Sequence, residues 1–354
     1  MQKSPQQTIL MIRAGALGDC LLMLPTLHAL RAHFPQARID VMGYPPRWAW
    51  VLGRGLVDMV HTIERPGMHL LFGEGIEAPA ALKSFLGAYD VILSYRPDAD
   101  GVFERSLRAQ GARTVLCQPP FPPPPPPKIH TADFALQLVA RLGVPLPPAA
   151  SGLDLTDAER ALVQPFFAAH HIALSKQPIV VVHPGSGSAA KRWPVENFAT
   201  LIESLEGPLH VRTVIVTGYA EADVAAKLRS LLHTATPLVA ENWPLSPMMA
   251  LIGQATVFVG HDSGLTHLAA ALRRPTVAIF GPTDPEIWGP RGEYVTVVPM
   301  ERTHADANRR GPAQGTFRPA RRDLQQVLEA VQHWLAMETP RLKSRSLNDR
   351  SGQS

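Results

Sequence analysis

Cysteine is scarce in this 354-residue chain, which contains only Cys20 and Cys117. Two cysteines so far apart give neither a disulfide framework nor the paired spacing of a zinc site. The chain also lacks an apolar run of about 18 residues, the length that a membrane-spanning helix requires. Residues 1–8 are polar and the apolar run 9–12 is too short for a signal-peptide core, so we expect a cytoplasmic protein.

Excess charge of one sign is also missing from most of the chain. The net charge is +4, and residues 302–354 hold ten Lys/Arg against five Asp/Glu, so the remainder is close to neutral. We therefore expect no nucleic-acid partner. The basic segment has two interpretations, a solvated tail or attraction to an anionic surface, which would place the protein at the cytoplasmic face of the inner membrane.

Strand-like apolar runs alternate with helical patterns along the chain. Strands are predicted at 8–12, 38–42, 57–63, 89–94, 178–183, 211–217, 257–259 and 276–280. Helices are predicted at 18–33, 131–142, 156–170, 195–205, 220–232, 265–272 and 323–337, with a break near Pro25. The alternation predicts an α/β fold of two doubly wound halves with mostly parallel sheets, and the length suits two domains.

Proline marks the predicted division. The run at 119–127 cannot join a helix or a central strand, so it is interpreted as a semi-rigid spacer rather than a signalling ligand. We predict a first domain at 1–175 with a Pro-rich insertion at 119–127, and a hinge near 170–178. A second domain is predicted at 176–320, a C-terminal helix at 321–338 and a disordered tail at 339–354.

The segment 257–285 contains the clearest functional signal. It shows a strand, a tight turn with Asp262, Ser263 and Gly264, a small apolar helix and another strand. Backbone N–H groups at such a helix start favour an anion such as phosphate, and this sheet edge is where open α/β folds bind ligands. His267 follows on the first helical turn, either as a packed core histidine or as a ligand contact.

The loop Arg13-Ala-Gly-Ala-Leu-Gly-Asp19 connects the first predicted strand to the first helix. Gly15 and Gly18 allow a tight turn, but they do not form the G-x-G-x-x-G fingerprint of dinucleotide-binding folds. Asp19 lies in the first helical turn. It is either a charge favoured by the helix dipole or a general base at the mouth of a cleft.

Two further loops follow predicted strands in the second half. Residues 183–194 offer N–H and O–H donors from Ser186 and Gly187 and a cation from Lys191, a set that suits a diphosphate unless the loop is merely flexible. No Gly-Lys-Ser/Thr follows, so this is not a P-loop. Glu221 either accepts from a ribose hydroxyl pair or is another helix-start charge.

Three other patterns are set aside. In Gly260-His-Asp-Ser-Gly264 the serine is one place too late for a nucleophile elbow. Asp98-Ala-Asp100 has turn composition rather than that of a metal site. His170-His171 has no partner ligands at a recognisable spacing.

The four loops, in this order, resemble those of the ADP-heptose:lipopolysaccharide heptosyltransferases, glycosyltransferase family 9. The matching pieces are I-R-x-G-A-L-G-D, V-V-V-H-P-G-S-G-S-A-A-K-R-W-P, T-G-Y-A-E and G-H-D-S-G-L-T-H-L-A-A-A-L-R-R-P with F-G-P-T-D-P. The similarity spans about residues 8–337. It implies a GT-B fold, in which two Rossmann-like domains face a central cleft, with the acceptor on the first and the nucleotide-sugar on the second.

The resemblance also implies roles for individual residues. It makes Asp19 the catalytic base, with Gly18 on the acceptor side. The donor-binding set is Ser186, Gly187, Lys191, Glu221, Asp262, Ser263, Gly264 and His267. The implied reaction is inverting, metal-independent transfer of a sugar, heptose from ADP-heptose, to a lipopolysaccharide-core or related glycan, without a cofactor.

The chain departs from the family pattern in two places, and two alternative functions remain open. The proline run and the C-terminal extension are unlike the family, and residues 66–86, where acceptor contacts would lie, match no motif. The alternatives are a sugar-nucleotide epimerase of similar fold and a non-catalytic sugar-nucleotide-binding protein. The sequence does not identify the acceptor.

Overall fold

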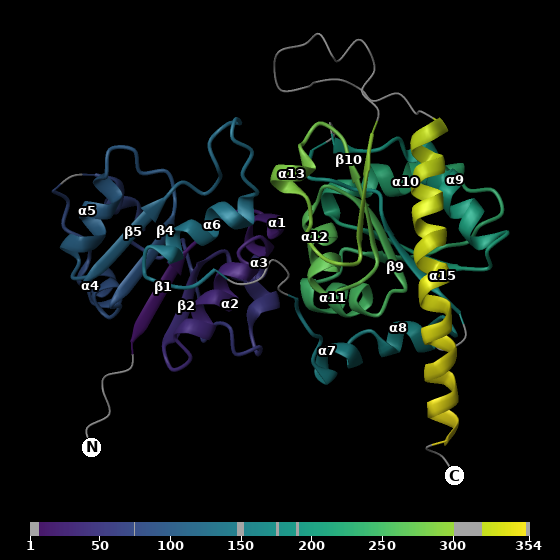
Figure 1. The fold of residues 1–354 in the computed structure, drawn as a ribbon, viewed down its shortest axis with the longest axis horizontal. Coiled ribbons are helices and arrows are strands. Elements are labelled where there is room, and N and C mark those ends of the chain that lie inside the picture. The colour runs from purple at the N-terminus through teal and green to yellow at the C-terminus, as the bar shows by residue number, and fades with distance from the viewer. Residues whose placement is uncertain are drawn as a thin grey trace, which may run out of the picture. The chain divides into compact units, whose positions relative to one another are not determined.

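The computed structural model describes residues 7–73, 75–146, 152–174, 177–188, 191–300 and 321–351. The chain divides into two compact units, residues 1–151 and 152–354 (Figure 1). Each unit contains one parallel β-sheet interleaved with helices. The predicted α/β fold of two doubly wound halves is therefore confirmed.

The first unit contains a five-stranded sheet in the order β3-β2-β1-β4-β5. Its strands are β1 (Thr8–Ile12), β2 (Arg38–Gly43), β3 (Met59–Thr62), β4 (Val91–Tyr95) and β5 (Thr114–Gln118). Neighbouring strands are parallel, so Ile9 of β1 lies opposite both Ile39 and Val91. The strand order reverses between β1 and β4, and the loops after these two strands leave the same sheet edge in different directions.

Helices cover both faces of this sheet. They are α1 (Leu17–Leu21), α2 (Leu24–His33), α3 (Pro45–Trp48), α4 (Ala80–Gly87), α5 (Val102–Ala109) and α6 (Thr131–Ala140), with 3₁₀ turns η1 (Ala49–Val51) and η2 (Met68–Phe72). Helices α2 and α6 pack against each other. Apolar residues of η2, α4 and α5 pack with β1, β2, β4 and β5 in one buried cluster.

Proline breaks a helix near Pro25 as predicted, but the proline run at 119–127 does not divide the two units. The predicted helix 18–33 is two helices, because α1 ends at Leu21 and α2 begins at Leu24 with Pro25 in its first turn. The run at 119–127 joins no helix or strand. It does not separate the two units, since α6 follows it and packs on α2 of the first unit.

The second unit contains a six-stranded parallel sheet in the order β11-β10-β9-β6-β7-β8. Its strands are β6 (Ile179–His183), β7 (Arg212–Thr217), β8 (Leu238–Glu241), β9 (Val257–His261), β10 (Thr276–Phe280) and β11 (Val295–Pro299). Strands β6, β9 and β10 are buried throughout, as expected for parallel strands covered on both faces. Here the order reverses between β6 and β9.

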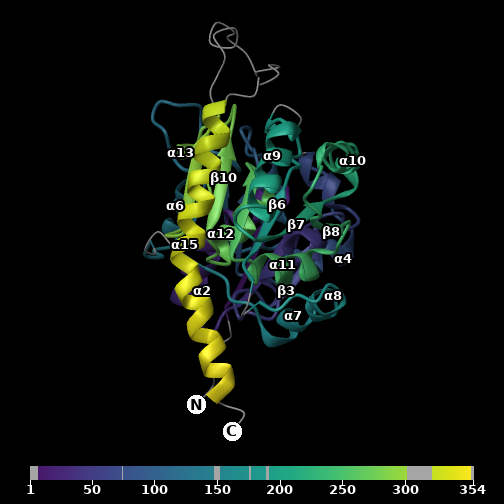
Figure 2. The same ribbon diagram turned by 90° about the vertical axis from the view of Figure 1, so that its right-hand side faces the viewer.

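The helices of the second unit form two groups. Helix α9 (Val195–Glu206) contacts α10 (Ala222–Leu231) and α15 (Arg321–Ser351), while α11 (Leu245–Gly253) contacts α12 (Gly264–Ala271) and α7 (Asp157–Ala161). Three short elements complete the unit: α8 (Gln164–Ala169), the 3₁₀ turn η4 (Tyr219–Glu221) and α13 (Pro285–Trp288). Figure 2 shows α15 lying along the second unit.

The C-terminal helix extends further than predicted. Val327, Val331 and Leu335 recur every four residues and are buried in the core with α9 and the sheet, as the amphipathic pattern at 323–337 predicts. The helix continues to Ser351, where the sequence indicated a disordered tail. Among the described residues, no helix has both the length and the apolar character to cross a membrane.

The helical segment between the two sheets also differs from the prediction. The predicted helix 156–170 is split into α7 and α8, with Pro165 in the first turn of α8. Both helices belong to the second unit, and Leu153 donates its N–H to the Ala271 carbonyl there. The structural division therefore falls at residue 151/152, whereas the predicted domain boundary is at 175/176 and the predicted hinge near 170–178.

Candidate active site

Each predicted functional loop begins where a strand ends, at the carboxyl edge of its sheet. In the first unit the loop after β1 leads to Asp19, next to the reversal between β1 and β4. In the second unit the loops after β6 and β9 carry Lys191 and Asp262 and flank the reversal between those strands. Open α/β sheets bind ligands at such positions.

Asp19 is held by its own helix start. Its Oδ2 accepts the Ala16 N–H at 2.8 Å, which satisfies one of the unpaired donors at the beginning of α1. Gly15 is required beside it, because a Cβ there would lie 2.7 Å from Asp19 Oδ2. The side chain of Asp19 is 23% exposed, so this carboxylate is both oriented and open to a reactant. Gly18 belongs to the same helix and its carbonyl accepts the Leu22 N–H.

Two arginines surround the Asp19 loop. Arg13 is buried and its Nη2 lies 3.8 Å from Asp19 Oδ1. Arg47, from α3, donates from Nη1 to the Gly15 carbonyl at 2.6 Å and stacks over Tyr44. These contacts fix the backbone of the loop from one side and present a positive charge to its carboxylate from the other.

Lys191 and Asp262 form the central ion pair of the second unit. Lys191 Nζ lies 2.6 Å from Asp262 Oδ2, and the same oxygen accepts the Thr283 hydroxyl at 2.7 Å. The Asp262 side chain is 9% exposed, whereas that of Lys191 is 30% exposed. The buried carboxylate therefore holds a partly exposed cation at the sheet edge, where it can meet an anion.

The glycine- and serine-containing part of the loop after β6 lies against this pair. Ser186 is buried and its hydroxyl donates to the Asp262 carbonyl at 3.4 Å. Gly187 is exposed, with nothing within 4 Å of a Cβ built there. The Ser186 hydroxyl is thus used within the protein, and the exposed backbone of Gly187 lies next to it.

Glu221 is held in its ionised form by neighbours. Its Oε2 accepts the Gly218 N–H at 2.8 Å and lies 3.4 Å from His183 Nε2. Burial alone would raise the pKa of Glu221, but the interaction with His183 and the Gly218 N–H outweigh it and lower the pKa to about 2. A Cβ at Gly185 would overlap with this carboxylate, so only glycine fits there.

His183 connects Glu221 to the turn after β9. Its Nδ1 lies 3.2 Å from Ser263 Oγ, which is also 3.1 Å from Thr266 Oγ1. Ser263 occupies the position before α12 and Gly264 is the first residue of that helix. His267 is buried on α12 and its N–H bonds to the Ser263 carbonyl. The turn is thereby fixed with the N-terminus of an eight-residue helix at its end.

His261, the last residue of β9, holds the loop after β6 at two points. It is fully buried, and burial lowers the pKa of its imidazole to about 3, so the ring is neutral. Trp193 N–H donates to Nε2 at 2.5 Å, which leaves Nδ1 to donate to the Gly185 carbonyl at 3.0 Å. Gly185 and Trp193 lie on either side of Lys191 in sequence, so one histidine fixes both ends of the segment that carries the cation.

The structure thus connects most of the predicted donor-binding residues within the second unit and places Asp19 and Gly18 in the first. Three further residues of the site, Arg13, His183 and His261, had no role predicted from the sequence. All three share one signal that could have identified them: each is a basic or imidazole side chain at or just after the end of an apolar strand. The contacts of the two histidines join residues 38 to 80 positions apart in the chain. No local sequence pattern reveals such contacts.

The Asp98-x-Asp100 pattern has a capping role. Asp98 accepts the N–H groups of Phe103 and Glu104, both at 2.9 Å, and Asp100 accepts that of Val102. Within the described residues, Asp98, Glu104 and Cys117 lie close enough to share a cation. Both Asp98 oxygens already serve α5, which explains the aspartates as helix-start residues.

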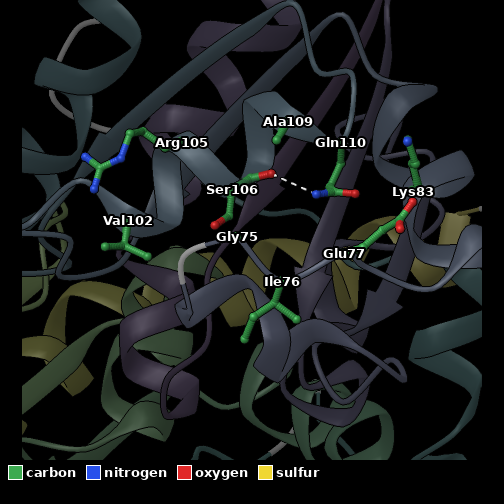
Figure 3. A pocket seen from close by; sticks show the side chains of 9 residues that line it. All are labelled: Gly75, Ile76, Glu77, Lys83, Val102, Arg105, Ser106, Ala109 and Gln110. Atoms are coloured by element: carbon green, nitrogen blue, oxygen red, sulfur yellow. Dashed lines mark hydrogen bonds between the residues drawn. The ribbon is translucent and has the colours of Figure 1, made fainter.

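A separate pocket of about 530 Å³ lies in the first unit (Figure 3). One wall is a stripe of α5 with Val102, Arg105, Ser106 and Ala109, and the opposite side is formed by residues 75–77 and Lys83. Gln110 completes the lining and donates to the Ser106 carbonyl. None of the predicted site residues lines the pocket, and one side of it belongs to the segment 66–86 that matched no motif.

Comparison with known proteins supplies a family. The model of glycosyltransferase family 9 (heptosyltransferase) matches residues 125–315, more than half of the chain. Lipooligosaccharide heptosyltransferase 2 of Haemophilus influenzae is 25% identical over 93% of this chain and 99% of its own length.

Solved structures show the same fold at lower identity. A family 9 glycosyl transferase from Veillonella parvula aligns with a TM-score of 0.75 at 19% identity, covering 95% of this chain and 99% of its own. The ADP-heptose lipopolysaccharide heptosyltransferase II of Escherichia coli aligns with a TM-score of 0.68 at 20% identity, covering 94% and 99%. The two Rossmann-like units are therefore those of a GT-B fold, as predicted.

Proposed function

This chain belongs to glycosyltransferase family 9, the heptosyltransferases, and from that premise we propose that it transfers heptose from ADP-heptose to a lipopolysaccharide-core or related glycan acceptor. The chain is a glycosyltransferase, and the H. influenzae relative carries the name of a lipooligosaccharide heptosyltransferase. The donor, the acceptor and the stereochemical course are the parts that we propose.

The second unit is the proposed donor site. Lys191, the exposed backbone at Gly187 and the start of α12 behind Ser263 and Gly264 supply cationic and N–H groups for a diphosphate. The ionised Glu221 is suited to accept hydrogen bonds from ribose hydroxyls. The name of the E. coli enzyme, an ADP-heptose heptosyltransferase, supports adenosine as the nucleoside and heptose as the sugar.

Asp19 is the proposed general base. Its oriented, partly exposed carboxylate takes the proton of the acceptor hydroxyl while that oxygen bonds to the anomeric carbon of the donor. The bond from this carbon to the diphosphate oxygen breaks in the same step, so the configuration inverts. The electron pair leaves with ADP, and Lys191 with the α12 N-terminus stabilises the charge that develops there.

We propose that this stabilisation does not depend on a metal ion. The charge on the leaving diphosphate is met by a cation and backbone N–H groups that this chain itself places at the sheet edge. In this scheme Asp262 fixes Lys191 through their ion pair and contacts the donor sugar, while Ser186 and His267, which bond to the Asp262 and Ser263 carbonyls, complete the proposed donor-binding set.

The acceptor is assigned to the first unit, on the side of Gly18 and Asp19. Localisation at the cytoplasmic face of the inner membrane remains a prediction from the basic segment, of which residues 302–320 and 352–354 lie outside the described part. The predicted domain boundaries likewise stay a proposal.

The observation that carries the function is the Lys191–Asp262 pair beside the Ser263–Gly264 turn, at the reversal point of the second sheet. Calorimetry with ADP-, UDP-, GDP- and CDP-linked sugars, with and without divalent metal, tests the donor. We expect preference for ADP-heptose in both conditions and a product of inverted anomeric configuration with a core acceptor. Preference for a UDP-sugar with absolute metal dependence would contradict the proposal.

A further inference from the structure

Arg13 is a buried cation beside Asp19. It directly follows β1 and is 1% exposed. Its N–H donates to the Met42 carbonyl at 2.9 Å, and its carbonyl accepts Trp48 Nε1 at 3.2 Å, so the backbone is fixed on both sides. Because arginine is rarely buried without a partner, the position of this side chain needs a reason.

Neither Nε nor Nη2 of the Arg13 guanidinium provides that reason through a hydrogen bond. Nη2 is 3.8 Å from Asp19 Oδ1, which is an ion-pair distance but too long for a hydrogen bond. Nε and Nη2 are buried and find no hydrogen-bond partner in the described part of the chain. Buried unpaired donors are unfavourable for stability, so an apolar side chain of similar volume would serve the fold equally well or better.

The orientation of Asp19 suggests what the charge does. Oδ2 is occupied by the Ala16 N–H, so Oδ1 is the oxygen that remains for a proton, and Oδ1 is the one that faces Arg13. A guanidinium at this distance attracts the carboxylate without occupying the oxygen through a direct hydrogen bond. It therefore fixes the rotation of the carboxylate while leaving Oδ1 available.

A residue of the proline-rich run covers the Arg13 side chain. The ring centroid of Phe121 lies 4.9 Å from Arg13 Cζ, within the range of a cation–π contact. Phe121 is followed by six consecutive prolines, residues 122–127, whose rings restrict the backbone that carries it. The run that departs from the family pattern thus contributes a side chain next to the catalytic loop.

We propose that Arg13 positions the Asp19 carboxylate for proton abstraction and that Phe121 of the proline-rich run stabilises the guanidinium in that position. The proposal rests on Asp19 being the base, as set out under the proposed function. Arg13 is a positioning residue, and the proton itself goes to Asp19 Oδ1.

Arg13→Met and Arg13→Lys test the proposal in the full-length protein. We expect Arg13→Met to lower kcat by about 10- to 100-fold, as a misplaced reacting group does. The Kd for ADP should be unchanged, and Tm equal to or above that of the wild type, because a buried charge is replaced by an apolar group. Arg13→Lys should recover part of the lost kcat.

Arg31→Met is the matched control for a structural arginine. Arg31 donates to the Ala37 carbonyl at 2.7 Å and pairs with Asp58 at 2.8 Å, next to the amino ends of β2 and β3. Its replacement should lower Tm and leave kcat unchanged. Phe121→Leu keeps an apolar cover without a π face, and we expect a loss in kcat of about 2- to 5-fold, the equivalent of one exposed cation–π contact.

The outcomes separate the two proposals. An unchanged kcat in Arg13→Met would overturn the positioning role. A fall in kcat together with a lowered Tm, the Tm effect expected of Arg31→Met, would overturn it as well. Arg13→Lys turning over no faster than Arg13→Met would overturn the role of the charge. Unchanged turnover in Asp19→Asn would instead contradict the base assignment itself, whatever Arg13→Met shows.

Discussion

At the scale of single residues, the site depends on side chains that hold a proposed ligand-binding residue in place while leaving it able to contact the ligand. Asp262 holds Lys191, and His183 lies between Glu221 and Ser263. The residues proposed to bind the donor could be named from the sequence, because their chemistry is visible in the loop sequences. The residues that hold them were not, because His183 and His261 act through contacts across dozens of positions in the chain.

Lys191→Ala should weaken ADP binding by about 10- to 100-fold, because the site loses the cation that Asp262 holds. Calorimetry with ADP measures the effect directly. Lys227→Ala is the matched control: Lys227 forms an ion pair of the same 2.6 Å length with Glu196 on the surface. It should leave ADP affinity unchanged, and equal losses in both variants would contradict the phosphate role of Lys191.

The neutral buried His261 predicts a pH dependence of stability. Its pKa is about 3 in the folded protein and 6.5 when unperturbed, so the unfolded chain binds the extra proton between these values. The free energy of unfolding should therefore fall as pH decreases from about 6.5, with a slope approaching about 1.4 kcal/mol per pH unit from this group alone.

Denaturant titrations of the wild type and His261→Gln between pH 7 and 4.5 check this expectation. The variant should be less stable at pH 7, because it loses the contacts to Trp193 and Gly185, and its stability should depend less on pH. Parallel pH curves for the two proteins would contradict the neutral state of His261.

At the scale of secondary-structure elements, periodicity and proline account for what could be predicted. The continuous apolar runs identified the buried strands, and Pro25 marked the break between α1 and α2. The segment 156–170 was misjudged as one helix, although Pro165 divides it. Helix α15 was underestimated, because its apolar stripe ends near Leu335 while the helix continues to Ser351.

Helix α15 should contribute to the stability of the second unit through its buried stripe. Val331 is fully buried in the core, while its neighbour Gln332 is exposed. Val331→Ala should lower the free energy of unfolding by about 1–3 kcal/mol through lost packing, and Gln332→Ala by less than about 0.5 kcal/mol. Urea denaturation measures both, and equal effects would show that the stripe does not anchor this helix.

At the scale of the whole molecule, each unit carries its own proposed functional loops at the carboxyl edge of its own sheet. The alternating pattern was sufficient to predict two doubly wound halves, since each apolar strand and following helix is visible locally. The division between them was not predictable from proline content. The run at 119–127 lies within the first unit. Leu153 donates its N–H to the Ala271 carbonyl and the Leu155 side chain lies against Gly253, both in the second unit.

The separation of loops between units makes chemistry and donor binding independently measurable. Asp19 belongs to the first unit and the Lys191–Asp262 pair to the second. Asp19→Asn is the sharpest variant, because its amide oxygen can still accept the Ala16 N–H and keep the start of α1 intact while the base is removed.

Heptose transfer and ADP-heptose affinity, measured side by side for Asp19→Asn and the wild type, test the central claim most directly. We predict that turnover falls by at least about 100-fold, the contribution of a positioned general base, while the Kd for ADP-heptose stays within about 2-fold of the wild-type value. Turnover at the wild-type rate in Asp19→Asn would contradict the account.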